Sequence, residues 1–158
     1  MQRRSRHKFL TTVLLLTVAI AFVCCNRKAI YSHYETIATN GWNRADTIRF
    51  DIKPSEESVS ASGTINIRIN DDYPFTTLTL AVSEQILPDG VCFQDTIQFS
   101  LIDDKGRSLG QGINLHNFQQ PLHAYKFTDD QHLIVKVHHL MDQQLPGIIN
   151  VGVSLQRH

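Results

Sequence analysis

The sequence predicts an all-β protein: a two-layer antiparallel β-sandwich, Ig-like or jelly-roll-like, behind an N-terminal lipoprotein signal peptide. Apolar and polar residues alternate with a period of two in six segments, which is the spacing of strands with one buried face. Turn-forming residues stand between these segments. No stretch after the N-terminal region has the length and periodicity of an amphipathic helix.

The first element in the chain is a predicted lipoprotein signal peptide over residues 1–24. Four basic residues precede the uncharged apolar run Phe9–Val23, which ends at the pair Cys24-Cys25. This order is typical of a secretory signal. A cysteine at its end is the acceptor of a lipid anchor, in which each buried methylene contributes roughly 0.8 kcal/mol.

The acylated residue is predicted to be Cys25, with Cys24 as the alternative. The residue before the acylated cysteine should be small, and Cys25 follows Cys24, whereas Cys24 follows the β-branched Val23. Residues 25–30 are then the acylated cysteine and a short tether, and residues 31–158 are the sandwich domain. A plain transmembrane anchor is less favoured, because the apolar run of 15 residues is shorter than the ~20 that a spanning helix needs.

The six strand predictions share one pattern, in which Ile, Leu, Val or Phe occupies every second position and polar or small residues mostly fill the others. They are Thr47–Ile52, Gly63–Asn70, Thr77–Val82, Thr96–Leu101, Leu133–His138 and Val151–Gln156. Weaker candidates are Ser108–Ile113 and Ala124–Phe127.

Between the strands, turn chemistry predicts the connections. Pro54–Ser62 is interpreted as a long exposed loop, and Asn70–Pro74, Pro88–Gly90 and Asp103–Gly106 as turns. Gln85-Ile86 and His139–Gln144 are the segments that could form a helical turn. The pattern Asp-Thr-Ile-x-Phe begins at both Asp46 and Asp95, and is interpreted as two equivalent strand starts. Cys92 has no partner for a disulfide and is expected to be a small buried residue.

Charge argues against a nucleic-acid partner. Outside the signal peptide the chain has 11 basic and 15 acidic residues, so the body is mildly acidic and has no long-range attraction for phosphate backbones.

The motifs that could carry chemistry have simpler structural explanations. Gly106–Gly110 matches G-x-S-x-G, but a nucleophile elbow needs a strand that turns into a helix, so a hydrolase using Ser108 is the least favoured function. The histidines are scattered and form no metal-ligand spacing, and the paired acids lie in turns. We therefore expect no enzymatic activity, no cofactor and no metal site.

Trp42 precedes the first strand and is interpreted as a packing residue more readily than as a sugar platform. A carbohydrate-binding or adhesive sandwich is the alternative function. It would need exposed coplanar aromatic rings, for which Trp42, Tyr73 and Tyr125 are the candidates.

From Tyr31 onward, the order of short motifs resembles the gliding-motility lipoprotein family GldH of the Bacteroidetes. The motifs that carry the resemblance are Tyr31–Tyr34, Trp42–Thr47 with Phe50, Ile67–Asn70, Asp72–Phe75, Asp95-Thr96, Gly106–Gly112, Met141, Leu145–Ile148 and Val151-Gly152. One departure is Asp142 after Met141, where the family pattern has Arg.

The resemblance implies an envelope lipoprotein that is needed for gliding or for the linked protein-secretion machinery. We expect it to be anchored to a membrane by its lipid, in the outer membrane facing the periplasm, with other envelope proteins of these machineries as partners. The expected contact residues are exposed aromatics near the anchor: Tyr31, Tyr34 and Trp42.

Overall fold

The structure, a computed structural model, describes residues 29–54, 58–128, 130–142 and 144–157. The signal peptide, Cys24, Cys25 and the tether up to residue 28 lie outside the described residues. In the described ranges the regular structure is all β-strand, which confirms the predicted fold class. Nothing in them forms a helix with the length and apolar character needed to cross a membrane.

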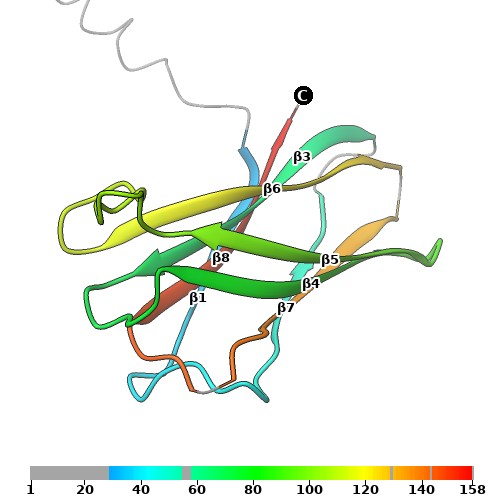
Figure 1. Ribbon diagram of the computed structural model, residues 1–158. Coiled ribbons are helices and arrows are strands. Elements are labelled where there is room, and N and C mark those ends of the chain that lie inside the picture. Colours follow the sequence, from blue (N-terminus) through cyan, green and yellow to red (C-terminus); the bar gives the residue numbers. More distant parts are fainter. Residues whose placement is uncertain (1–28, 55–57, 129, 143, 158) are drawn as a thin grey trace, which may run out of the picture.

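The described residues form eight strands, and Figure 1 shows them stacked in two layers. They are β1 (Ala29–Thr36), β2 (Ile48–Ile52), β3 (Val59–Ile69), β4 (Thr77–Leu87), β5 (Val91–Ser100), β6 (His116–Phe127), β7 (His132–His139) and β8 (Ile148–Arg157).

The strand order is that of a jelly roll. One sheet has the order β1-β8-β3-β6 and the other β2-β7-β4-β5, and every neighbouring pair is antiparallel. Sequentially adjacent strands mostly lie in opposite sheets, as in a doubled Greek key. This decides between the two predicted topologies in favour of the jelly-roll-like one.

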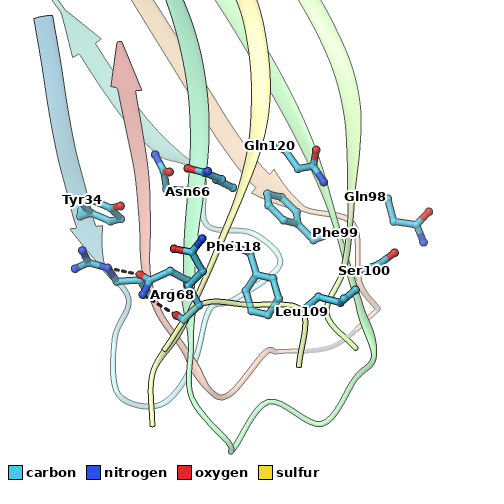
Figure 2. A pocket seen from close by; sticks show the side chains of 12 residues that line it. Tyr34, Asn66, Arg68, Gln98, Phe99, Ser100, Leu109, Phe118 and Gln120 are labelled. Carbon is cyan, nitrogen blue, oxygen red and sulfur yellow. Dashed lines mark hydrogen bonds between the residues drawn. The ribbon is translucent and has the colours of Figure 1, made fainter. Parts of the chain in front are cut away.

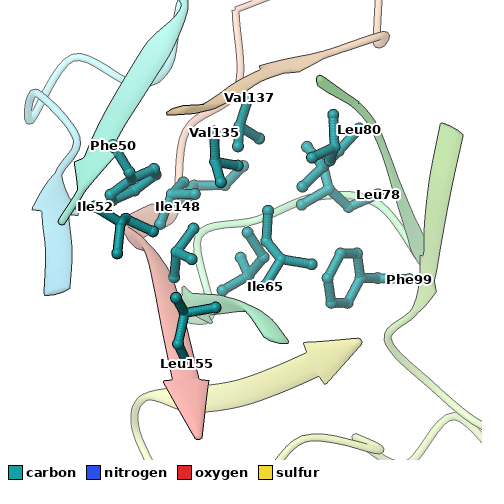
Figure 3. Close-up of a cluster of buried hydrophobic side chains, with 14 of the residues drawn as sticks. Phe50, Ile52, Ile65, Leu78, Leu80, Phe99, Val135, Val137, Ile148 and Leu155 are labelled. Carbon is teal, nitrogen blue, oxygen red and sulfur yellow. The ribbon is translucent and has the colours of Figure 1, made fainter. Parts of the chain in front are cut away.

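The six strongly patterned segments are all strands, because each needs to bury only one face. Their apolar positions meet between the sheets, where Ile52, Ile65, Leu80, Val135 and Leu155 are fully buried. Figure 3 shows side chains from both layers interdigitating there. A Leu or Ile buried in this way contributes roughly 1.5–3 kcal/mol, so the alternation decides which face turns inward.

Several weaker predictions are wrong. Strand β3 begins at Val59, inside the segment interpreted as the loop Pro54–Ser62. Gln85-Ile86 continues strand β4 instead of forming a helical turn. Ser108–Ile113 forms isolated bridges and no strand, whereas Ala124–Phe127 is the end of β6, a strand that begins earlier.

Two further corrections concern the predicted starts of strands β1 and β5. The tether predicted up to residue 30 overlaps β1, which starts at Ala29 and pairs with β8. Asp95 does not start a strand, because β5 begins at Val91. The longer β5 also explains why Cys92 is exposed and not buried: the register that turns Phe99 inward turns the even-numbered residues outward.

The connections at one end of the sandwich, which we call the distal end, hold one another through main-chain hydrogen bonds. The distal end consists of residues 37–47, 70–76, 101–115, 140–142 and 144–147. Trp42 N donates to Leu145 O at 2.8 Å, Asn70 N to Gly147 O at 2.9 Å, and Leu101 N to Thr76 O at 2.9 Å. The opposite end contains the start of β1 and the end of β8.

Candidate interaction surface

The three aromatic residues predicted as partner contacts do not form one surface. Tyr31 is opposite the buried Leu155 in the register of β1 with β8, so its ring packs against the core. Tyr34 is opposite Gly152, on the outer face of the same sheet. Of the two tyrosines, Tyr34 is therefore the one placed for contact with another molecule.

Trp42 is buried, with 1% of its surface exposed, so the expectation that it is an exposed contact is wrong and the packing interpretation is confirmed. Its indole Nε1 donates to Asp46 O at 3.1 Å, and its ring meets the ring of His139 edge-on at 5.1 Å. Trp42 closes the distal end of the core.

The aromatic set required for a sugar platform is buried as well. Tyr73 donates its hydroxyl to Thr77 O at 2.9 Å, and Tyr125 donates to a carboxylate oxygen of Glu84 at 2.6 Å. Burial raises the pKa of both phenols above the usual value. Rings that face the interior cannot stack on a sugar, so these residues do not support a carbohydrate-binding role.

The outer face of the sheet β1-β8-β3-β6 carries rows of hydrogen-bonded polar side chains, which we call the polar platform: Ser32, Ser154, Asn66, Tyr34, Arg68 and Asn117. In one row, Asn66 Nδ2 donates to Ser154 Oγ at 3.1 Å, and Ser154 Oγ lies 3.4 Å from Ser32 Oγ. A solvent-facing side of an antiparallel sheet is expected to be polar; here the polar groups also link three strands.

The second row of the platform centres on Arg68. Its guanidinium carbon lies 4.0 Å from the centroid of the Tyr34 ring, and its Nε donates to Asn117 Oδ1 at 3.0 Å. A glycine is required under the ring, because a Cβ on Gly152 would lie 2.5 Å from Tyr34 Cδ1. Stacking and hydrogen bonding hold the cation in one place.

Arg68 has hydrogen-bond donors that are available to another molecule. No described residue accepts a hydrogen bond from its two terminal nitrogens, which are the atoms that bind a carboxylate in a bidentate manner. In the sequence this residue is part of the polar half of the clearest strand, Gly63–Asn70, so the alternation that predicted the core also pointed to it.

A cleft of about 580 Å³ borders the platform and continues around the edge strand β6. Figure 2 shows Tyr34, Asn66 and Arg68 on one side of β6, and Phe99, Leu109 and Phe118 on the other. Leu109 is 55% exposed, and Ile113 in the same distal segment is 88% exposed. The cleft thus places one held cation beside apolar side chains that water reaches.

Ser108, the hydrolase candidate, lies close to a histidine but not in a nucleophile elbow. Its Oγ is 3.1 Å from His116 Nδ1, and His116 Nε2 is 3.6 Å from Asp71 Oδ1. The second distance is too long for a hydrogen bond, and the Asp71 side chain is 83% exposed. Ser108 sits in an isolated bridge with Ile102, whereas the elbow needs a strand that turns into a helix.

The fold brings together a histidine and two acidic residues that are far apart in the sequence. Glu84, Asp95 and His123 have donor atoms within 4.8 Å of one another. They come from β4, β5 and β6, so no short sequence motif contains all three residues.

Comparison with known families and proteins shows a similarity that covers most of the chain. The family model described as GldH lipoprotein matches residues 29–155. The gliding motility lipoprotein GldH of Flavobacterium johnsoniae is 26% identical over 100 residues, which is 63% of this chain and 62% of that protein. A homolog of GldH from Christiangramia forsetii is 26% identical over 164 residues, covering 96% of this chain and 98% of that protein.

Solved structures resemble the chain only loosely. The Eiger TNF structure from S. frugiperda has a TM-score of 0.39 at 10% identity and covers 84% of this chain and 94% of its own. Dimeric latent PorU from Porphyromonas gingivalis has a TM-score of 0.32 at 10% identity, covering 82% of this chain and 13% of its own. Similarity at this level carries no functional argument.

Proposed function

The chain belongs to the GldH lipoprotein family, and on that premise we propose that it works as a non-catalytic interaction module of the gliding-motility machinery or its associated protein-secretion machinery. Family membership implies a lipid anchor and association with the cell envelope. The anchor is Cys25 in our proposal, held in the outer membrane with the sandwich facing the periplasm.

The anchor orients the sandwich relative to the bilayer. Three residues, Asn26 to Lys28, separate Cys25 from the start of β1 at Ala29, and this length of chain reaches at most about 14 Å. The end of the sandwich with the start of β1 therefore stays near the lipid. The distal end and its exposed Ile113 then point away from the membrane, toward other envelope proteins.

The observation that carries the interaction role is the held guanidinium of Arg68 beside the cleft. An arginine whose position is set by stacking on Tyr34 and by Asn117 loses little conformational freedom when it binds a partner. The partner that fits is a protein segment that presents a carboxylate to Arg68 and an apolar side chain to Leu109 and Phe118.

A non-catalytic role agrees with the chemistry around the surface. The platform offers amides, hydroxyls and one guanidinium, which bind and orient but do not supply a nucleophile with its base. The Ser108–His116 pair has an exposed acid at 3.6 Å and no elbow, so it lacks the fixed geometry of a working triad.

Co-purification of the native complex tests this proposal. The tagged full chain, expressed in a gliding host and extracted in mild detergent, is expected to bring down envelope proteins of the gliding or secretion machinery. Arg68→Ala should reduce their recovery strongly, because a central interface arginine is worth about 2 kcal/mol or more, roughly thirty-fold in affinity.

Arg49→Ala is the matched control. Arg49 is also an exposed arginine on a strand, but it lies on β2 in the other sheet and pairs with Asp51 at 3.6 Å. We expect this variant to recover the same partners as the wild type. Recovery of the wild-type protein alone, or equal losses in both variants, would argue against the polar platform as the contact surface.

A further inference from the structure

A cluster of donor atoms lies where the edge strands of the two sheets meet. His123 Nδ1 on β6 is 3.2 Å from Glu84 Oε2 on β4 and 3.4 Å from Asp95 Oδ2 on β5. The three side chains line a cleft of about 280 Å³ together with Thr96 and Pro121. The cluster is separate from the polar platform and is not part of the proposed interaction role.

Glu84 and Asp95 point toward the cluster because each occupies the inward-facing position next to the apolar residues of its strand. Glu84 follows Leu80 and Val82 on the inward face of β4, and Asp95 precedes Ile97 and Phe99 on β5. Each occupies a position where the stripe predicts an apolar residue. Carboxylates at two such neighbouring positions need a reason other than packing.

His123 reaches the cluster through a β-bulge. In the pairing of β3 with β6, Ser62 is opposite Ala124 and Thr64 is opposite Pro121, so Leu122 and His123 together face Gly63. A bulge shifts the alternation by one residue and re-aims the side chains that follow. Without it, His123 and Tyr125 would point outward.

Glu84 is the strongest sign that the cluster holds a ligand. Its side chain is buried, with 1% of its surface exposed, and its Oε1 has no hydrogen-bond partner among the described residues. A carboxylate removed from water is costly unless it is paired with a cation or coordinates a metal. The other oxygen of this carboxylate, Oε2, accepts from the Tyr125 hydroxyl and lies 3.2 Å from His123 Nδ1.

From these observations we propose that Glu84, Asp95 and His123 bind a divalent transition-metal ion of the zinc type. Ligands at 2.0–2.2 Å from a tetrahedral ion stand about 3.3–3.6 Å apart, and the two separations from His123 Nδ1 are 3.2 and 3.4 Å. One nitrogen and two carboxylates are a donor set that zinc accepts, and Glu84 would bind through both oxygens, so that the unpartnered Oε1 gains a partner. A fourth position is left toward the open cleft for water.

Neighbouring side chains hold the ligands in place, as around metal sites in general. Tyr125 donates its hydroxyl to Glu84 Oε2 at 2.6 Å. The ring of Phe93 stacks on His123 with centroids 4.2 Å apart and planes 17° apart. Both contacts fix the direction of the donor atoms and leave the cleft side open for an ion to enter.

The competing explanation is an ion pair between protonated His123 and the two carboxylates, with no metal. The metal-site explanation predicts that the chain binds metal stoichiometrically and that Tyr125 affects metal affinity. The ion-pair explanation predicts neither. A hydroxyl that only fills space has no effect on an ion, whereas one that orients a ligand changes metal affinity by about 10–100-fold.

The experiment uses the full chain without a polyhistidine tag, purified in detergent and stripped with a chelator. Calorimetric titration with ZnCl₂ is expected to show one ion per chain, and CoCl₂ should give the intense visible bands of a tetrahedral ion. His123→Gln and Asp95→Asn should each lower zinc affinity by at least about ten-fold, and Tyr125→Phe by about ten-fold.

The control is His33→Gln. His33 forms the same kind of pair, with Nε2 3.0 Å from Glu35 Oε1 on the edge strand β1, but no third possible ligand lies beside it among the described residues. This variant should bind zinc as the wild type does. Circular dichroism and melting establish that each variant is folded. Should His123→Gln fail to fold, the half-exposed Asp95 provides the same test.

No zinc uptake by the wild-type chain at a large molar excess of metal would overturn the proposal. So would zinc affinity that is equal in the wild type and in folded Asp95→Asn or His123→Gln. In either case the cluster is an ion pair, and the interaction role proposed for the other surface is unaffected.

Discussion

Glu84 and His139 are buried titratable residues, and each has an atom that no described residue hydrogen-bonds. For His139 the neutral state follows from its neighbours. Nε2 lies 3.2 Å from Trp42 O, and because a carbonyl only accepts, Nε2 carries the proton. Nδ1 is buried without a partner, so a second proton there would be a charge in an apolar site.

Burial lowers the pKa of His139 below its ordinary value of 6.5. Unfolded chains then take up a proton near pH 6.5, while folded chains resist it until a lower pH. The stability that neutral His139 contributes is therefore complete above about pH 6.5 and is lost as the pH falls through the folded pKa.

We predict that His139→Gln flattens the dependence of unfolding free energy on pH below about pH 6.5, because glutamine can donate to Trp42 O without titrating. Denaturant unfolding at a series of pH values measures this. His138→Gln, at the adjacent and less buried position, is the control and should keep the wild-type profile. Parallel profiles for the wild type and His139→Gln would contradict the prediction.

Strand β6 is the element on which both sites depend. Before its bulge, Asn117 faces the polar platform and Phe118 faces the cleft; after it, His123, Tyr125 and Phe127 face the interior. Pro121 is tolerated here because β6 is an edge strand. The first half of β6 thus contributes side chains to the polar platform and the cleft, and its second half contributes side chains to the cluster of Glu84, Asp95 and His123.

The bulge is matched by a glycine on the neighbouring strand. A Cβ on Gly63 would lie 2.9 Å from Tyr125 Cε2 and 3.0 Å from Leu122 Cβ. We predict that Gly63→Ala lowers the free energy of unfolding by about 1–3 kcal/mol through overpacking, and that zinc affinity falls because the Tyr125 hydroxyl moves from Glu84.

Denaturant unfolding and zinc calorimetry check both parts of this prediction. Ser62→Ala, one residue earlier in β3, is the control and should change stability by less than about 0.5 kcal/mol. An unchanged stability in Gly63→Ala would mean that β6 shifts freely and that the bulge is not held by this contact.

At the scale of the whole molecule, the jelly roll separates the end that contains the start of β1 from the distal end. The start of β1 is next to the end of β8, with Ala29 opposite Gln156. Figure 1 shows the end of β8 close to the start of β1 and away from the connections of the distal end. In the proposed orientation, an anchor at Cys25 would leave the cleft and the polar platform accessible to other envelope proteins.

We predict that the mature chain from envelope membranes begins at Cys25 and carries the added mass of a thioether-linked diacylglycerol and an amide-linked acyl chain. Mass spectrometry of the native N-terminus measures this. Cys25→Ala should abolish the lipid mass and release the domain from washed membranes, whereas Cys24→Ala should remain bound. A native polypeptide that starts at Met1, dissolves without detergent and has no lipid mass would contradict the anchor.

The sequence by itself determined the fold class, six of the strands and the face that each buries, because alternation of apolar residues is a local property. The same alternation also indicates where the two acids of the cluster point. Extending the alternation of β4 past Val82 and that of β5 before Ile97 places Glu84 and Asp95 on the inward-facing side of their strands and Cys92 on the outer side.

Only the tertiary structure decided the jelly-roll order, the burial of Trp42 and the meeting of Glu84 and Asp95 with His123. Strand order depends on which edges pair across long stretches of chain, and no local pattern encodes it. The position of His123 depends on a bulge opposite Gly63, and a one-residue shift reverses the face of every residue after it. A site built across three strands becomes visible only when those strands are paired.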